Sequence, residues 1–212
     1  MPKKATATHD PDVAYTPPEL VRALLAPAIR PALAPPTSHV WEPCAGDGGF
    51  ARILRDHVAH VVATEVDPVV ALTGGTICAD ARYWSPPNRS AYPKIPGTRD
   101  PSWEIWTNPP FSLSEDLVRT WLGLPDPPTR LVLLLRGGWL LAARRLDLLP
   151  HLDRIIHLTP RISFGGPGRE DHVGQSDTHH HDILVLRPDR PYSGPGGSKP
   201  SWHYDWRNQV LR

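Results

Sequence analysis

Residues 40–50, with the sequence Val-Trp-Glu-Pro-Cys-Ala-Gly-Asp-Gly-Gly-Phe, decide the fold of this chain. An apolar strand is predicted over residues 39–42, and it runs into a turn that contains Gly46 and Gly48. A helix is predicted to follow over residues 50–58. Because glycine has no side chain, a Gly-x-Gly turn between a strand and a helix lets the backbone come close to a ligand. A tight turn without a ligand explains the glycines equally well when the motif is taken alone.

Strand and helix patterns alternate on both sides of this turn. Such alternation is typical of a parallel sheet whose strands are joined by helical crossovers, so we predict an α/β fold with helices on both faces of the sheet. The apolar run over residues 131–135 has the pattern of a strand that is buried on both faces. The other predicted elements are strands over 61–65, 76–79, 103–106, 154–158 and 182–186, a helix from Pro68, and a helix carrying Leu140, Leu141, Leu146 and Leu149.

Two helices are predicted to begin at capping boxes, in which a Ser or Thr and a Glu three residues later exchange hydrogen bonds with backbone amides. Thr16 and Glu19 have this spacing and predict a helix from about Pro17. Ser112 and Glu115 have the same spacing and predict a helix that continues through residue 121.

The chain of 212 residues is long enough for one domain with a real core, to which we assign residues 1–189, with 1–14 flexible. Residues 190–212 have the composition of a Gly/Pro-hinged, aromatic and basic tail, and we expect them to lie outside the core. Lys and Arg number 23 against 22 Asp and Glu, which argues against a protein that holds nucleic acid by bulk charge.

Several function classes are disfavoured by the composition. The only two cysteines, Cys44 and Cys78, are too few for a disulfide scaffold and lack the paired spacing of a zinc site. The longest apolar run is far too short to span a bilayer, and the first ten residues lack the apolar stretch of a signal peptide. We therefore expect a soluble protein of the cytoplasm, without a metal.

Two carboxylates are predicted to end neighbouring strands. Glu65 follows Gly48 by 17 residues, close to the distance at which nucleotide-binding folds place a carboxylate on ribose hydroxyls. Asp80 ends the next predicted strand, where it could accept a hydrogen bond from an adenine amino group. Solvated strand ends or helix caps are the alternative interpretation of each carboxylate.

Asn108-Pro109-Pro110-Phe111 follows the fourth predicted strand at the same edge of the sheet. Two prolines prevent both helix formation and strand pairing, so they predict a rigid loop. This loop can present the side-chain carbonyl of Asn108 and the backbone carbonyl of Pro109 to one amine. The Phe111 ring can stack on a planar base.

With these motifs in this order, residues 10–188 resemble the S-adenosylmethionine-dependent methyltransferases of the class I fold, specifically the DNA adenine-N6 branch. The resemblance implies a Rossmann-like, mostly parallel seven-stranded sheet with an antiparallel last strand. It also implies S-adenosylmethionine as cofactor and DNA as partner. The cofactor-binding residues that it implies are Tyr15, Thr16, Pro17, Glu42, Ala45, Gly46, Asp47, Gly48, Glu65, Val66, Asp80 and Asn108.

The same resemblance implies that Asn108, Pro109, Pro110 and Phe111 are the catalytic residues. The target adenine would be flipped out of the stack, held by Phe111, and oriented by hydrogen bonds from its N6 amine to Asn108 and Pro109. Trp84, Phe164 and Arg169 are candidate substrate contacts, although Phe164 is equally well explained as a core aromatic. His179, His180 and His181 suggest a metal site, but neighbouring residues that enter a strand point to opposite faces, so we favour a solvated or substrate-contacting loop.

No separate target-recognition domain is evident, so we expect a short or relaxed recognition site in a monomer or weak dimer. Base reading would come from residues 81–101, residues 163–181 and the aromatic residues 202–207 of the tail. Alternative functions are methylation of RNA or of a protein glutamine amide, and a catalytically inactive DNA-binding accessory protein of the same fold.

Overall fold

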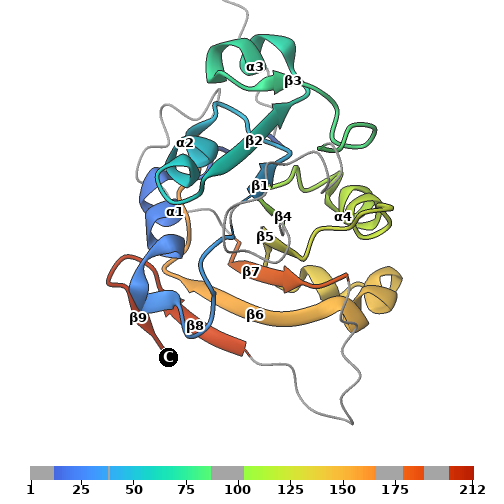
Figure 1. The fold of residues 1–212 in the computed structure, drawn as a ribbon. Coiled ribbons are helices and arrows are strands. Elements are labelled where there is room, and N and C mark those ends of the chain that lie inside the picture. Colours follow the sequence, from blue (N-terminus) through green and yellow to red (C-terminus); the bar gives the residue numbers. More distant parts are fainter. Residues whose placement is uncertain (1–11, 38, 87–102, 166–178, 189–200) are drawn as a thin grey trace, which may run out of the picture.

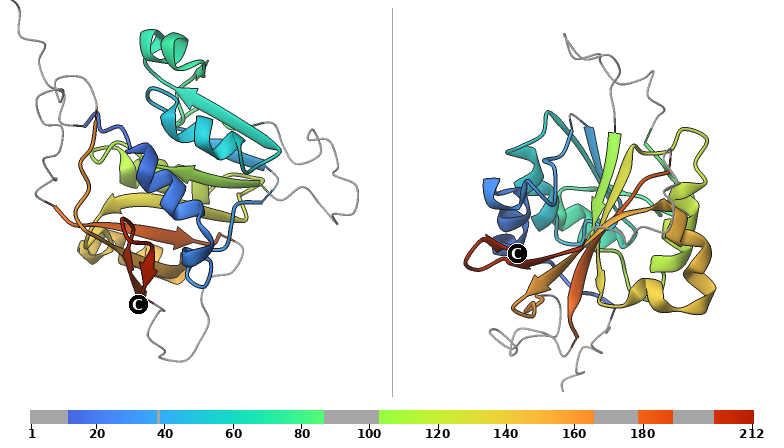
Figure 2. Two further views of the ribbon diagram at one scale, coloured as in Figure 1. Left: turned by 90° about the vertical axis from the view of Figure 1, so that its left-hand side faces the viewer. Right: turned by 90° about the horizontal axis from the view of Figure 1, so that it is seen from below.

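The computed structural model describes residues 12–37, 39–86, 103–165, 179–188 and 201–212, which form one nine-stranded sheet with helices on both sides (Figures 1 and 2). The strand order is β3-β2-β1-β4-β5-β7-β6-β8-β9. Within the described residues, no helix is both long and apolar enough to cross a membrane.

Parallel strands form the half of the sheet that carries the Gly-x-Gly turn. They are β1 (His39–Glu42), β2 (His60–Glu65), β3 (Ile77–Cys78), β4 (Trp103–Thr107) and β5 (Arg130–Arg136). Strand β7 (His181–Leu186) is antiparallel to both of its neighbours, β5 and β6 (Leu152–Thr159). These strands confirm the predicted α/β fold with a mostly parallel sheet and an antiparallel strand. The sheet has nine strands rather than the predicted seven, and the antiparallel β7 is not the last of them.

Helices cover both faces because the central strands bury side chains on both. Along β5, Val132 and Leu134 belong to one apolar cluster, and Leu131, Leu133 and Leu135 belong to the other. The first cluster packs against α1 (Pro18–Leu25) and α2 (Gly49–Arg55), and the second against α4 (Ser114–Leu122). In Figure 2 the two groups of helices lie on opposite sides of the sheet. The remaining helical segments are η1 (Pro27–Ile29), α3 (Pro68–Gly74), η3 (Trp139–Leu141) and η4 (Ala143–His151).

Neither predicted capping box forms. Helix α1 has Pro17 as its N-cap and α4 has Leu113, and neither N-cap makes a side-chain cap hydrogen bond. Each helix begins later than the spacing predicted, which leaves Thr16 and Ser112 outside it. Ser112 instead donates its backbone N–H and its hydroxyl to the carboxylate of Asp12.

The segment after β5 is a pair of 3₁₀ segments rather than the predicted amphipathic helix. Leu140 is buried, whereas Leu141 and Leu146 are exposed and Leu149 is just over one third exposed. Pro150 lies near the end of η4 and cannot donate a helical hydrogen bond, so a regular helix could not continue past it.

The expectation that residues 190–212 lie outside the core is wrong for residues 201–212. Strand β8 (Ser201–Asp205) pairs in parallel with β6, and β9 (Val210–Leu211) pairs with β8. Tyr204 is fully buried, and its hydroxyl donates to the carbonyl oxygen of Ala23 at 3.0 Å. The Trp206 indole N–H donates to the Pro160 carbonyl oxygen at 2.8 Å. The stretch of sequence before this strand is polar and rich in Gly and Pro. It therefore obscures the alternation of Trp202, Tyr204 and Trp206, which has the period of a strand.

Candidate active site

A cavity of about 480 Å³ opens where β1, β2 and β4 end. It is lined by the N-terminal segment 12–15, the glycine turn, the end of β2 and the Asn-Pro-Pro-Phe loop. Carboxyl ends of parallel strands meet at one edge of a sheet, which is where ligands of open α/β folds bind. The volume lies in the range of small-molecule sites.

The two glycines of the turn have different roles. Gly46 has a φ of +53°, and a Cβ placed there would lie 2.9 Å from the ring of Tyr15, which also lines the cavity. Gly48 has a φ of +74°, and its missing side chain makes room for the carbonyl oxygen of Gly74 at the end of α3. Gly46 therefore faces the cavity, and Gly48 serves chain packing.

Glu65 is held rigidly at the cavity wall by backbone amides. Its Oε2 accepts from Gly46 N–H at 2.8 Å, and its Oε1 accepts from Val66 and Asp67 N–H at 2.9 and 3.1 Å. A carboxylate has about four acceptor positions, so one remains for a ligand hydroxyl. Val66 is mostly exposed and lines the same cavity.

Glu42 ends β1 with a fully buried carboxyl group. The hydroxyl of Thr107 donates to its Oε1 at 2.6 Å, and its Oε2 has no hydrogen-bond partner in the described part of the chain. Burial raises the pKa of Glu42 to about 8, although hydrogen bonds from Thr107 and from the backbone of Cys44 act in the opposite direction. The group lines a narrow recess beside the main cavity, together with Thr16, Ala45 and Asp47.

Asp80 lies beside the site with its oxygens already engaged. It lines a small recess of about 70 Å³, and the guanidinium of Arg82 donates to both carboxylate oxygens at 2.6 to 3.1 Å. These hydrogen bonds hold the pKa of Asp80 below its usual value. A ligand amino group would share Asp80 with Arg82.

Asn108 is fixed by one half of its side-chain amide. The Nδ2 group donates to the Ala14 carbonyl oxygen at 2.8 Å, while the buried Oδ1 accepts no hydrogen bond from the described residues. Pro109, Pro110 and Phe111 line the cavity with it. The loop therefore offers an unused acceptor in a cavity that also presents an aromatic ring.

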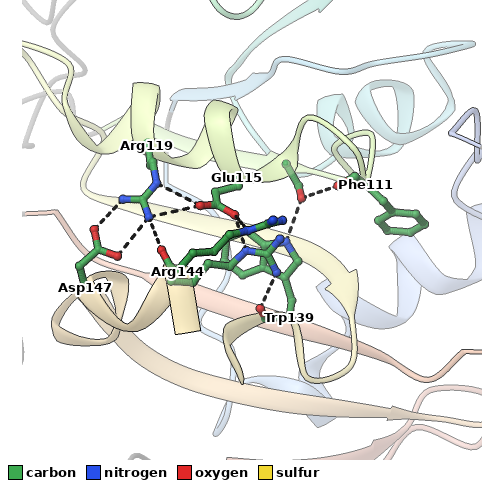
Figure 3. Close-up of polar contacts among 8 residues, drawn as sticks. Phe111, Glu115, Arg119, Trp139, Arg144 and Asp147 are labelled. Carbon is green, nitrogen blue, oxygen red and sulfur yellow. Dashed lines mark hydrogen bonds and ion pairs between the residues drawn. The ribbon is translucent and has the colours of Figure 1, made fainter. Parts of the chain in front are cut away.

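A buried chain of hydrogen bonds supports this loop from behind. The hydroxyl of Ser114 donates to the Phe111 carbonyl oxygen at 2.8 Å, and the Trp139 indole N–H donates to that hydroxyl at 2.8 Å. Arg145 in turn donates to the Trp139 carbonyl oxygen at 2.6 Å. Figure 3 shows the Phe111 ring pointing away from this network.

Glu115 joins the same support to the segment after β5. Its carboxylate pairs with Arg144 at 2.6 Å, Arg145 at 2.9 Å and Arg119 at 3.3 Å (Figure 3). Burial alone would raise the pKa of Glu115, but hydrogen bonds from Arg145 and Arg144 outweigh this effect and hold the pKa below its usual value. Arg119 also pairs with Asp147 at 2.6 Å.

The Phe111 ring lies close to residues from β5 and β7. The guanidinium of Arg136 lies 4.4 Å from the ring centroid of Phe111. The His181 ring lies 5.8 Å from Phe111 and 4.9 Å from Phe164, in an edge-to-face arrangement with the latter. His181 and Phe164 are both buried. Phe164, a predicted substrate contact, therefore lies beside the histidine ring that neighbours Phe111.

Other predicted residues are not brought into the cavity. Pro17 lines a separate hollow with Trp206 and Arg207. Trp84 packs against Trp41 with ring centroids 5.6 Å apart, partly buried against the apolar cluster under α4. Arg169 lies outside the described residues, as does most of residues 81–101 and 163–181. Residues 202–206 belong to β8 and the turn after it, so they are not a free base-reading tail.

Two residues of the site, Asp12 and Ala14, carry no signal in the sequence. Asp12 and Ala14 reach it because the backbone of Tyr15 bridges that of Gly165, with N–H···O distances of 2.9 and 3.0 Å. Cys44 lines the cavity as a half-buried free thiol, and burial raises its pKa well above the usual value. Only long-range contacts bring Asp12 and Ala14 to the glycine turn.

No protein-family model and no curated protein sequence matches the chain. Its structure is similar to that of the 23S rRNA methyltransferase ErmE, with a TM-score of 0.56, 14% identity, and 87% of this chain and 72% of that chain covered. A putative class I S-adenosylmethionine-dependent methyltransferase from Listeria monocytogenes has a TM-score of 0.57, 12% identity, and coverage of 93% and 68%. A putative RNA methyltransferase from Pyrococcus horikoshii has a TM-score of 0.58, 13% identity, and coverage of 87% and 91%. The chain therefore has the Rossmann-like fold of class I methyltransferases.

Proposed function

We propose that this protein transfers a methyl group from S-adenosylmethionine to the N6 amine of adenine in DNA. The observation that carries the proposal is Asn108, whose Oδ1 is buried and unused in the described residues while its Nδ2 is tied to Ala14. An acceptor fixed in this way, in a Pro-Pro loop with Phe111, suits a planar amine. The fold and the cofactor cavity supply the rest of the argument.

The residues of the cavity fit the cofactor. Glu65 has an acceptor position left for ribose hydroxyls, and Gly46 and Tyr15 form the wall beside it. The buried Oε2 of Glu42 lacks a partner in the described residues, and it would accept from the ammonium group at the amino-acid end. When bound, S-adenosylmethionine supplies an electrophilic methyl group on a sulfonium.

The residues of the chain act by positioning and by electrostatics. Asn108 Oδ1, with the Pro109 carbonyl, accepts hydrogen bonds from the N6 amine and directs its lone pair toward the methyl group. The base leaves the duplex, which costs a few kcal/mol, and it then stacks on Phe111. Trp139 and Ser114 hold the Phe111 backbone at the required place.

RNA is the second candidate acceptor, because two of the similar structures carry the names of RNA methyltransferases. The same loop would serve an adenine in either polynucleotide. We expect a short or relaxed recognition site. The near-zero net charge keeps the phosphate contribution to binding small, and salt screens that contribution, so activity should fall as salt rises.

One experiment separates the candidates. Tritiated S-adenosylmethionine is offered with unmethylated DNA, with RNA and with protein in parallel, and the products are digested to nucleosides or amino acids and separated. The proposal requires label in N6-methyldeoxyadenosine from DNA. Label in N6-methyladenosine from RNA alone would replace it with the second candidate, and no transfer to any acceptor would refute both.

A further inference from the structure

Arg136 has an unusual environment at the C-terminal end of β5. Its guanidinium lies over the Phe111 ring at 4.4 Å, on the loop that the proposed function makes catalytic. Its Nε is buried and has no hydrogen-bond partner among the described residues. None of the ion pairs between described residues includes Arg136. A partly desolvated cation without a counter-charge is costly unless a ligand supplies one.

The other arginines around the loop are already committed to acidic partners. Arg144, Arg145 and Arg119 pair with Glu115, and Arg119 also pairs with Asp147. Arg136 is therefore the described arginine beside the loop that still has its charge available for an anion. A planar guanidinium matches the geometry of phosphate oxygens and makes two parallel hydrogen bonds to them.

The position of Arg136 over the ring indicates where this anion belongs. A guanidinium stacks on an aromatic face much as a nucleobase does, so Arg136 covers part of the Phe111 surface that a base would use. The ring itself is braced by His181, whose own neighbour is Phe164. A base that stacks on this face of Phe111 would displace Arg136, and the anionic group that such a nucleotide carries with it is its phosphate.

We propose that Arg136 binds a phosphate next to the target nucleotide, after stacking on Phe111 in the free protein and yielding that place to the base. This inference rests on the proposed function, because it needs a polynucleotide acceptor. It assigns a substrate-binding role to a residue that the sequence pattern does not mark.

The test uses the full chain and a DNA duplex whose methylated adenine has first been located by sequencing. Single neutral methylphosphonates replace the phosphates on either side of that adenine, one at a time. Affinity is measured by fluorescence anisotropy between 50 and 200 mM salt for the wild type, R136A, R136K and the control R55A. Arg55 is an exposed arginine at the end of α2, away from the site.

For R136A we expect affinity for the unmodified duplex to fall roughly tenfold and the salt slope to fall by about one unit, as loss of one phosphate contact requires. One methylphosphonate should weaken the wild type and leave R136A unaffected. R136K should regain most of the slope, and cofactor affinity and melting temperature should stay at wild-type values in all variants.

Two results would overturn the assignment. The first is equal sensitivity of the wild type and R136A to every methylphosphonate, and the second is a joint loss of cofactor affinity and melting temperature in R136A, which indicates a structural role. A wild type that methylates DNA but gives either result refutes the role of Arg136 alone. A wild type that transfers no methyl group to DNA or RNA refutes the proposed function, and this inference with it.

Discussion

The side-chain Nδ2 of Asn108 donates a hydrogen bond to the backbone carbonyl oxygen of Ala14 at 2.8 Å, across 94 positions of the chain. This bond determines which end of the amide faces the cavity, and it leaves Oδ1 as the acceptor. It also ties the N-terminal segment to the edge of the sheet where the glycine turn lies. The orientation of the Asn108 side-chain amide thus depends on a contact between the Asn-Pro-Pro-Phe loop and the N-terminal segment.

Replacing Asn108 with alanine should abolish most turnover and leave cofactor binding nearly unchanged. The variant loses the acceptor that orients the amine, for which we expect about 10² to 10³-fold lower turnover. Radioactive methyl transfer and calorimetry with S-adenosylmethionine measure the two effects separately. N208A, in the turn after β8, is the matched control. Near-wild-type turnover by N108A would show that Asn108 is not a catalytic residue.

Replacing Glu65 with alanine should weaken cofactor binding by roughly 1.5 to 3 kcal/mol, because a charged hydrogen bond to the ligand is lost. Calorimetric titration checks this value. The exposed Glu19 provides the control variant E19A, which should bind like the wild type. Equal affinities of E65A and E19A would show that Glu65 only organises the turn through Gly46 and Val66.

Glu42 should make the stability of the protein depend on pH. Folding raises the pKa of Glu42 from 4.5 to about 8, so its contribution to stability is complete below pH 4.5 and is lost as the pH rises through 8. E42Q has no such titration. The unfolding free energy of E42Q minus that of the wild type should therefore increase by about 2 to 3 kcal/mol between pH 6 and pH 9, at about 1.4 kcal/mol per pH unit below pH 8.

Urea unfolding at both pH values measures this difference, with E19Q as the control that should show none. A difference between E42Q and the wild type that stays constant from pH 6 to pH 9 would mean that Glu42 is already ionised at pH 6 in the folded protein.

Replacing Ser114 with alanine should lower turnover severalfold without changing cofactor affinity. The variant removes the hydrogen bond to the Phe111 carbonyl and leaves the buried Trp139 indole N–H without its partner. An unsatisfied buried donor costs about 1 to 3 kcal/mol, which thermal or chemical unfolding detects. The exposed Ser201 supplies the control S201A, and a stability loss in S114A with wild-type turnover would show that the network serves folding alone.

Tyr204 tests whether the C-terminal strand belongs to the core. Y204F removes one hydrogen bond and should cost about 1 kcal/mol of unfolding free energy, whereas Y204A also leaves a cavity and should cost about 3 to 5 kcal/mol. Y83A is the matched control, since Tyr83 is 85% exposed and its loss should have little effect. Similar small losses of unfolding free energy for Y204A and Y83A would show that residues 201–212 do not contribute to the core.

The parts of the site that could be predicted are those in which neighbours along the chain act together. A strand, a Gly-x-Gly turn and a helix are local patterns, and the carboxyl ends of parallel strands necessarily share an edge. Glu42, Glu65 and the Asn108 loop could therefore be assigned to one place from the sequence. The capping boxes could not be judged in this way, because the first residue of each helix depends on what its flanks contact.

The sequence by itself determined the α/β alternation, the glycine turn and the rigid Pro-Pro loop, since these depend on backbone geometry and on spacing along the chain. The tertiary structure alone decided that Ala14 orients Asn108, that Arg136 lies on Phe111 and that Tyr204 completes the core. These contacts join residues far apart in sequence. Their partners are selected by packing and by the need of buried polar groups for hydrogen bonds, which no local pattern encodes.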